Sequence, residues 1–182
     1  MRLLLDACVL YPTVMREMLI GAARAGLYEP RWSARILAEW RHAAARLGPE
    51  MEGVARAEVA VLEAEFRVAA VPVQASAFPD LWLPDADDIH VLAAAIAGSC
   101  DGIVTMNAKD FPRDILAEEG VFRANPDELM VRFLEEKPQD ISDLARRVLD
   151  VANATAPEPF TLRGLMKKAR LPRLGKRLVE LG

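Results

Sequence analysis

Two clusters of polar side chains that could bind a ligand or take part in catalysis lie in one short segment of this chain, Leu83 to Phe111. They are Asp85, Asp87 and Asp88, followed by Thr105, Asn107 and Asp110. A very apolar predicted helix and a short predicted strand separate them. A helix that begins with carboxylates, and a strand that ends near others, can bring acids together at one edge of a sheet. Because hard divalent cations prefer oxygen ligands, the segment predicts a cation site.

Two acids outside this segment are candidates to join the site. Asp6 interrupts the apolar, strand-like run Leu3–Val9, in which we interpret Leu3–Leu5 as the first strand, and a carboxylate is rarely buried unless it is paired. Glu39 lies within a predicted helix, where it could instead be an exposed partner of Arg35 one turn earlier. Carboxylates that share a small volume repel one another and raise their pKa values. Bound Mg²⁺ or Mn²⁺ would remove that cost.

The same polar residues also have purely structural roles open to them. Helix capping is the alternative role for Asp87, Asp88 and Asp110, and turn hydrogen bonding is the alternative for Thr105 and Asn107. Asp85 is expected in a loop near the site. His90 is expected on the helix surface or in the core rather than as a ligand. A zinc site is not indicated, because the two histidines and two cysteines lack paired spacing.

Helices alternate with short apolar strands over about the first 135 residues, which predicts an α/β fold with a mainly parallel central sheet. In such a sheet ligands bind at the carboxyl ends of the strands, where Asp6 and Asn107 are expected. Beyond about residue 134 the pattern predicts helices alone, at roughly 138–152, 161–169 and 173–181. We therefore predict two parts, a domain at 1–135 and a helical C-terminal appendage with a basic tail at 136–182.

Composition and charge narrow the classes of protein. The chain has 182 residues, of which 52% are hydrophobic, so disorder is not expected. No apolar run approaches the roughly 18 residues of a membrane span, and the short apolar start does not resemble an export signal. We therefore expect a cytoplasmic protein with reduced cysteines. The net charge is −4, yet residues 159–182 contain seven basic residues and one acidic residue. This basic tail is either a contact surface or a solvated face.

Four features together resemble a PIN domain over about residues 2–135. They are Asp6 after the first strand, Glu39 on the second long helix, DIHVLAAA at 88–95 and IVTMNAKDF at 103–111. The resemblance is closest to the VapC-like toxin ribonucleases of bacterial toxin–antitoxin pairs. It implies a three-layer PIN-like α/β sandwich, a Mg²⁺- or Mn²⁺-dependent endoribonuclease, an RNA substrate and a small antitoxin partner.

Carried over by position, the resemblance assigns roles to individual residues. Asp6, Glu39 and Asp88 match the three family acids and are the expected metal ligands. Thr105 matches a supporting hydroxyl. The family commonly has aspartate where this chain has Asn107, so Asp110 is the candidate for the fourth carboxylate of the catalytic set. Candidates for RNA contact are Lys109, Arg113, Lys167 and Lys168.

Other functions are left open by the sequence. The Asn107 departure motivates a catalytically weak RNA- or protein-binding module that has kept the fold. A phosphatase of the haloacid-dehalogenase type is less favoured, because Cys8 occupies the position where that class needs an aspartate. The apolar side chains around Met15, Met18 and Leu19 could form a homodimer seam, although core packing is the commoner role for such residues.

Overall fold

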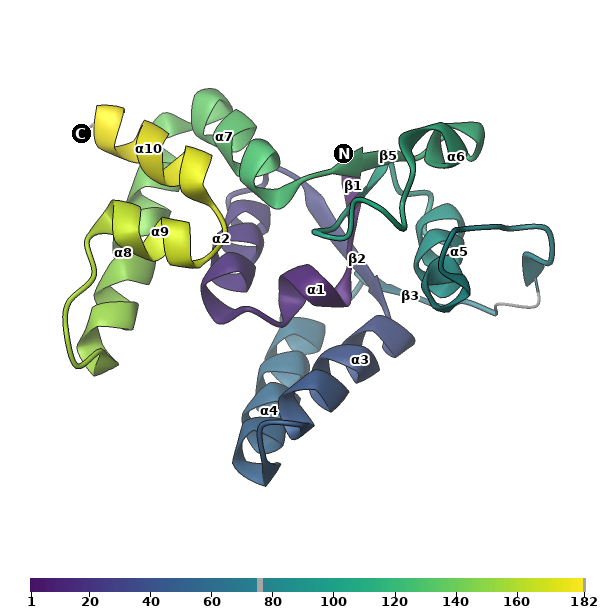
Figure 1. Ribbon diagram of the computed structural model, residues 1–182, viewed down its shortest axis with the longest axis horizontal. Helices are drawn as coiled ribbons and strands as arrows, with labels where there is room; N and C mark the ends of the chain where they lie inside the picture. Colours follow the sequence, from purple (N-terminus) through teal and green to yellow (C-terminus); the bar gives the residue numbers. More distant parts are fainter. Residues whose placement is uncertain (75–76, 182) are drawn as a thin grey trace. The chain divides into compact units, whose positions relative to one another are not determined.

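The chain divides into two compact units, one of which is built on a parallel sheet. The computed structural model describes residues 1–74 and 77–181. Unit 1 contains Met1–Tyr11 and Glu29–Ala124, and unit 2 contains Pro12–Tyr28 and Asn125–Gly182. The predicted α/β class, with a parallel sheet and additional C-terminal helices, is confirmed (Figure 1).

The sheet of unit 1 has five strands in the order β3-β2-β1-β4-β5, and all of its pairings are parallel. The strands are β1 (Arg2–Leu5), β2 (Glu29–Ser33), β3 (Ala70–Val71), β4 (Gly102–Val104) and β5 (Phe122–Ala124). The three leucines of β1 are fully buried, as expected for a central strand covered on both faces. Leu5 is in register with Val104, so the next residues, Asp6 and Thr105, leave the sheet side by side.

The first strand ends where the sequence predicted, since β1 ends at Leu5, directly before Asp6. The apolar run continues to Val9 in a strand-like pattern, but residues Ala7–Leu10 form a short helix, α1. The main-chain N–H of Asp6 still donates to the Val104 carbonyl of the sheet, whereas its own carbonyl accepts from Val9 and Leu10. The change from strand to helix therefore occurs at Asp6. An apolar run cannot reveal this change, because a buried strand and a buried helix have similar composition.

The helices of unit 1 hold the segments that carry the acids. They are α1, α3 (Ala34–Ala45), α4 (Pro49–Glu65), α5 (Ile89–Ala97) and α6 (Arg113–Glu118), with a 3₁₀ turn, η2 (Ala86–Asp88), before α5. Ser33 ends β2 and its hydroxyl accepts from the Ile36 N–H, so α3 begins at the carboxyl edge of the sheet. Helix α5 packs on β1, β2 and β4, and α3 packs on β2 and α4 (Figure 1).

Unit 2 is entirely helical in its described part. It consists of α2 (Thr13–Arg24), α7 (Pro126–Glu136), α8 (Pro138–Thr155), α9 (Leu162–Lys168) and α10 (Pro172–Leu181). Tyr28 stacks on Phe133 at 5.5 Å between ring centroids, and its hydroxyl donates to the Leu19 carbonyl. The predicted domain boundary at residue 135 stays a prediction, and Gly182 lies outside the described residues. Among the described helices, none has both the length and the apolar character that crossing a membrane requires.

Asp127 fixes the start of α10 within unit 2. Its carboxylate is buried and accepts from the backbone N–H groups of Arg173, at 2.9 Å, and Leu174, at 3.0 Å. The first N–H groups of a helix have no partner inside the helix, and negative charge at that end is favourable. The two bonds therefore join α7 to α10.

We predict that Asp127→Ala lowers the free energy of unfolding by about 2 kcal/mol, since hydrogen bonds to a charged group contribute about 1.5–3 kcal/mol. Urea unfolding followed by circular dichroism measures this. The control is Asp143→Ala, which removes an exposed carboxylate of α8 paired with Arg146 and should change stability by less than about 0.5 kcal/mol. Equal losses in the two variants would contradict the role assigned to Asp127.

Candidate metal centre

The carboxyl ends of β1 and β4 define the position of the site. Strands β2 and β3 lie on one side of β1, whereas β4 and β5 lie on the other side, so the chain changes side between β1 and β4. Ligands of parallel α/β folds bind at such a switch point. Asp6 follows β1, whereas Thr105 and Asn107 follow β4. The sheet topology therefore brings together residues that are about a hundred positions apart in the sequence.

Asp6 is buried and held by two side-chain donors. Its Oδ2 accepts from the Thr105 hydroxyl at 2.7 Å and from the Cys8 thiol at 3.1 Å. Burial, and then the charge of Asp6, raises the pKa of Cys8 to about 12. Cys8 therefore keeps its proton and acts as a donor. This role of Cys8 was not predicted, although a thiol two residues after a buried acid was the available signal.

Thr105 and Asn107 connect the two acids that follow the sheet. Thr105 Oγ1 accepts from the Asn107 N–H at 3.0 Å, which is the turn hydrogen bond that was one of the two interpretations. The same hydroxyl donates to Asp6, so the supporting role and the turn role are combined. Asn107 Nδ2 donates to Asp88 Oδ2 at 3.0 Å. The amide that stands where the family commonly has aspartate therefore orients Asp88.

Asp88 occupies the N-cap position of α5, but its side chain makes no cap hydrogen bond. Asp85 caps the preceding turn, η2, by accepting from the Asp87 N–H at 3.0 Å. The position that the capping interpretation gave Asp88 is therefore right, whereas its carboxylate is not used as a cap. Similarly, α6 follows Pro112 without a side-chain cap, so Asp110 does not cap that helix.

Three of the acids form a group with metal-binding geometry. One carboxylate oxygen from each of Asp85, Asp88 and Asp110 lies within 4.8 Å of the other two. Asp110 is buried, Asp88 is half-buried and Asp85 is exposed. Lys109 pairs with Asp110 at 3.5 Å, but its side chain is 85% exposed and such pairs are weak. Asp85, expected only near the site, is thus a member of this group.

The charges around Asp88 show that a cation would be favourable here. Burial, followed by the charges of Asp6, Asp85, Asp110 and Glu39 in that order, raises the pKa of Asp88 to about 6. Asp6 and Glu39 therefore lie close enough to act on Asp88, although they are outside the group of three. An all-oxygen set of mutually repelling carboxylates fits Mg²⁺ or Mn²⁺. Whether Asp6 and Glu39 contact the ion directly stays a prediction.

Glu39 is held by two cationic or donor groups. Its Oε1 accepts from Arg35 Nε at 3.2 Å and from His90 Nε2 at 2.9 Å. The Arg35 pair considered from the sequence is therefore present, together with a second partner that the sequence did not indicate. Burial lowers the pKa of His90, so its imidazole is neutral near pH 7 with the proton on Nε2. His90 Nδ1 is buried without a hydrogen-bond partner in the described part of the chain.

The four residues predicted to contact RNA are all exposed, but they belong to different units. Lys109 and Arg113 are in unit 1, close in sequence to Asp110. Lys167 and Lys168 are on α9 in unit 2. Their role in binding stays a prediction.

Comparison with known protein families agrees with this geometry. A family model described as the PIN domain matches residues 2–109, which is more than half of the chain and includes β1, Glu39, Asp88 and β4. The chain belongs to the PIN domain family. PIN domains are generally metal-dependent nucleases, and the group formed by Asp85, Asp88 and Asp110 could hold their metal. No curated protein and no solved structure matches the chain.

The raised pKa of Asp88 gives the metal-free PIN domain a specific pH dependence. A carboxyl whose pKa is raised by folding stabilises the fold below its ordinary pKa of 3.8, and this contribution is lost as the pH rises through about 6. We therefore expect the wild-type protein in EDTA to lose more stability between pH 4.5 and pH 7 than Asp88→Asn. Thermal unfolding at the two pH values tests this, and equal losses would contradict it.

Proposed function

We propose that this PIN domain protein is a Mg²⁺- or Mn²⁺-dependent endoribonuclease that hydrolyses RNA phosphodiester bonds. The observation that carries the proposal is the convergence on Asp88 of four other acids, at the carboxyl ends of β1 and β4. Membership of the PIN family supports nuclease activity. The choice of RNA as substrate rests on the resemblance of the motifs to VapC-like toxins.

In this proposal the residues of the site have different roles. Asp85, Asp88 and Asp110 would hold the ion, and Asp6 and Glu39 are the further predicted ligands. When bound, the ion supplies Lewis-acid activation of water and neutralises negative charge on the phosphodiester. Thr105 and Cys8 fix the orientation of Asp6, and Asn107 fixes that of Asp88.

The alternative role for Glu39, in place of contact with the ion, is to accept a proton from the attacking water. It is only partly buried, and its carboxylate accepts from both the Arg35 guanidinium and the His90 N–H. A base that is held by two donors keeps one orientation, which favours proton transfer at a fixed geometry. His90 and Arg35 would thus act on the reaction through Glu39.

The toxin role is also part of the proposal, with a small antitoxin as partner and a cytoplasmic location. It is supported by the resemblance of residues 88–95 and 103–111 to the toxin branch. Induced expression should arrest growth of a bacterial host, whereas Asp88→Asn should not. Growth arrest by both forms, or by neither, would contradict the toxin role.

Cleavage of RNA tests the enzymatic proposal. We expect wild-type protein with Mn²⁺ or Mg²⁺ to cleave a single-stranded RNA, and Asp88→Asn and Asp6→Asn to be at least about 100-fold slower, because each loses a carboxylate that the charged centre requires. The matched control is Asp114→Asn, which removes the same charge from an exposed position on α6 and should keep full activity. Gel analysis of labelled RNA with and without EDTA measures these rates.

A catalytically weak binding module is the second candidate, and Asn107 is the observation that favours it. The Asn107 side-chain amide donates to Asp88. Because the amide is neutral, Asn107 contributes no charge to the centre. Under the nuclease proposal, Asn107→Asp should increase Mn²⁺ affinity, because a further carboxylate joins the group. Absence of cleavage by wild type, with cleavage gained by Asn107→Asp, would favour the binding module.

A further inference from the structure

The basic residues of the C-terminal tail fall into two sets. Arg173, Lys176 and Arg177 of α10 form ion pairs with Glu128, Glu180 and Glu135 respectively. The others are Arg163, Lys167, Lys168 and Arg170, which form no ion pair within the described residues 1–74 and 77–181. All four are exposed. The unpaired set lies within eight consecutive residues, so its positive charge is concentrated at α9.

Two of these cations lie on one side of α9, and a third follows the helix. Arg163 and Lys167 are one helical turn apart, and Arg170 follows in the turn before α10 with a left-handed φ of 62°. Leu165 and Met166 of the same helix are buried. We name Arg163, Lys167 and Arg170 the basic row. Cations that form no ion pair in the described part of the chain attract a polyanion such as a nucleic-acid backbone.

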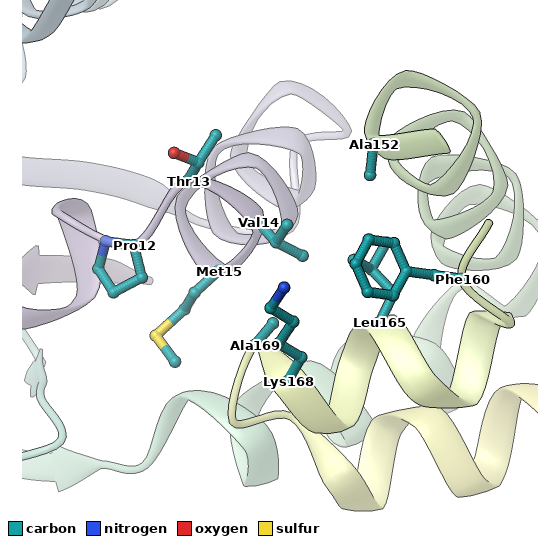
Figure 2. Close-up of a pocket in the computed structure, with 9 residues that line it drawn as sticks. All are labelled: Pro12, Thr13, Val14, Met15, Ala152, Phe160, Leu165, Lys168 and Ala169. Atoms are coloured by element: carbon teal, nitrogen blue, oxygen red, sulfur yellow. The ribbon is translucent and has the colours of Figure 1, made fainter. Parts of the chain in front are cut away.

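A pocket of about 270 Å³ lies beside the fourth cation. Its lining is apolar apart from Thr13 and Lys168, and consists of Pro12, Thr13, Val14, Met15, Ala152, Phe160, Leu165, Lys168 and Ala169 (Figure 2). The Lys168 ammonium lies 4.7 Å from the centroid of the Phe160 ring. The volume is below the 300–1,000 Å³ that is usual for drug-sized ligands, so the pocket suits a smaller group.

Phe160 is fixed in place before any ligand arrives. Its backbone N–H donates to Asn153 Oδ1 at 2.7 Å, and its carbonyl accepts from Asn153 Nδ2 at 3.1 Å. Both bonds connect the segment before α9 to α8. The ring itself is half-buried, so part of it remains accessible. An aromatic ring on a rigid support costs little entropy when a flat group stacks on it.

We propose that unit 2 contains a single-stranded RNA-binding surface, in which the basic row contacts phosphates and the pocket accepts one nucleobase against Phe160. The inference rests on the proposed function, since it assigns a surface to the RNA substrate. Single-strand binding sites combine a cationic track with aromatic stacking positions, and both are present here. A duplex would satisfy only the basic row, because its bases are stacked inside. An acidic protein partner is the alternative that the experiment tests.

The test measures binding of a fluorescent 12-nucleotide single-stranded RNA to the full chain in EDTA, over a series of salt concentrations. We expect the triple variant Arg163→Ala/Lys167→Ala/Arg170→Ala to bind at least about 10-fold more weakly at low salt. Its slope of log affinity against log salt should be smaller by about 2, since each phosphate contact on a single strand contributes about 0.7. The matched control, Arg132→Ala/Lys176→Ala/Arg177→Ala, removes three paired cations of unit 2 and should retain the wild-type slope.

The pocket is tested with a second ligand, an abasic strand of the same length and charge. Phe160→Leu should bind the RNA about 10-fold more weakly, yet bind the abasic strand as wild type does, because stacking needs a base. Lys168→Gln should also bind the RNA more weakly, by a smaller factor. This second variant tests the pocket independently in case Phe160→Leu is misfolded. Thermal unfolding of every variant confirms that it is folded.

Three outcomes would contradict the proposed RNA-binding surface. They are an unchanged salt slope in the basic-row variant, an equal change of slope in the control variant, or an equal loss of affinity for the RNA and the abasic strand in Phe160→Leu. Tight binding of an acidic peptide that RNA does not displace would point to a protein partner instead. Binding is measured without a divalent ion and cleavage with one. If wild type binds RNA but does not cleave it, only the proposed nuclease activity is contradicted. If wild type cleaves RNA but the basic-row variant keeps the wild-type slope of log affinity against log salt, only the proposed RNA-binding surface is contradicted.

Discussion

Mutual repulsion between carboxylates is the constraint on which the centre of this PIN domain depends. Asp88 carries the repulsion most directly, since its pKa is raised to about 6 by burial and by the charges of four other acids. Like charges at short range do not assemble without compensation. The fold imposes the assembly by placing Asp6 and Thr105 on adjacent parallel strands and Asp88 at the start of the helix that packs on them.

Neutral donors keep the acids in place without neutralising them. Thr105 and Cys8 donate to Asp6, and Asn107 donates to Asp88, so each bond restricts a carboxylate while its charge remains. Arg35 is different, because its guanidinium partly compensates Glu39. The acid paired with a guanidinium is thus the one proposed as the base, whereas Asp88, which is among the three proposed to hold the ion, is held by a neutral amide. This difference gives the five acids separate roles despite their similar chemistry.

Some features of the site could be read from the sequence, and others depended on contacts that no local pattern encodes. A charge inside an apolar run identified Asp6, and polar residues after a short strand identified Thr105 and Asn107. The parallel sheet followed from alternating strands and helices. The role of Asp85 could not be read, because it depends on a 3₁₀ turn and on a loop around Asp110 that have no periodicity. The contact between Glu39 and His90 spans 51 positions and arises only when α3 and α5 lie at the same edge of the sheet.

The most direct test of the central claim is a crystal structure of the full chain soaked in Mn²⁺, with anomalous diffraction to locate the ion. We expect an ion at the carboxyl ends of β1 and β4, with an Asp88 oxygen at roughly 2.0–2.6 Å and at least two further carboxylates among its ligands. Loss of that peak in Asp88→Asn would support the assignment. An ion bound elsewhere, or none near Asp88 at millimolar Mn²⁺, would contradict the claim that these acids are assembled to hold a metal.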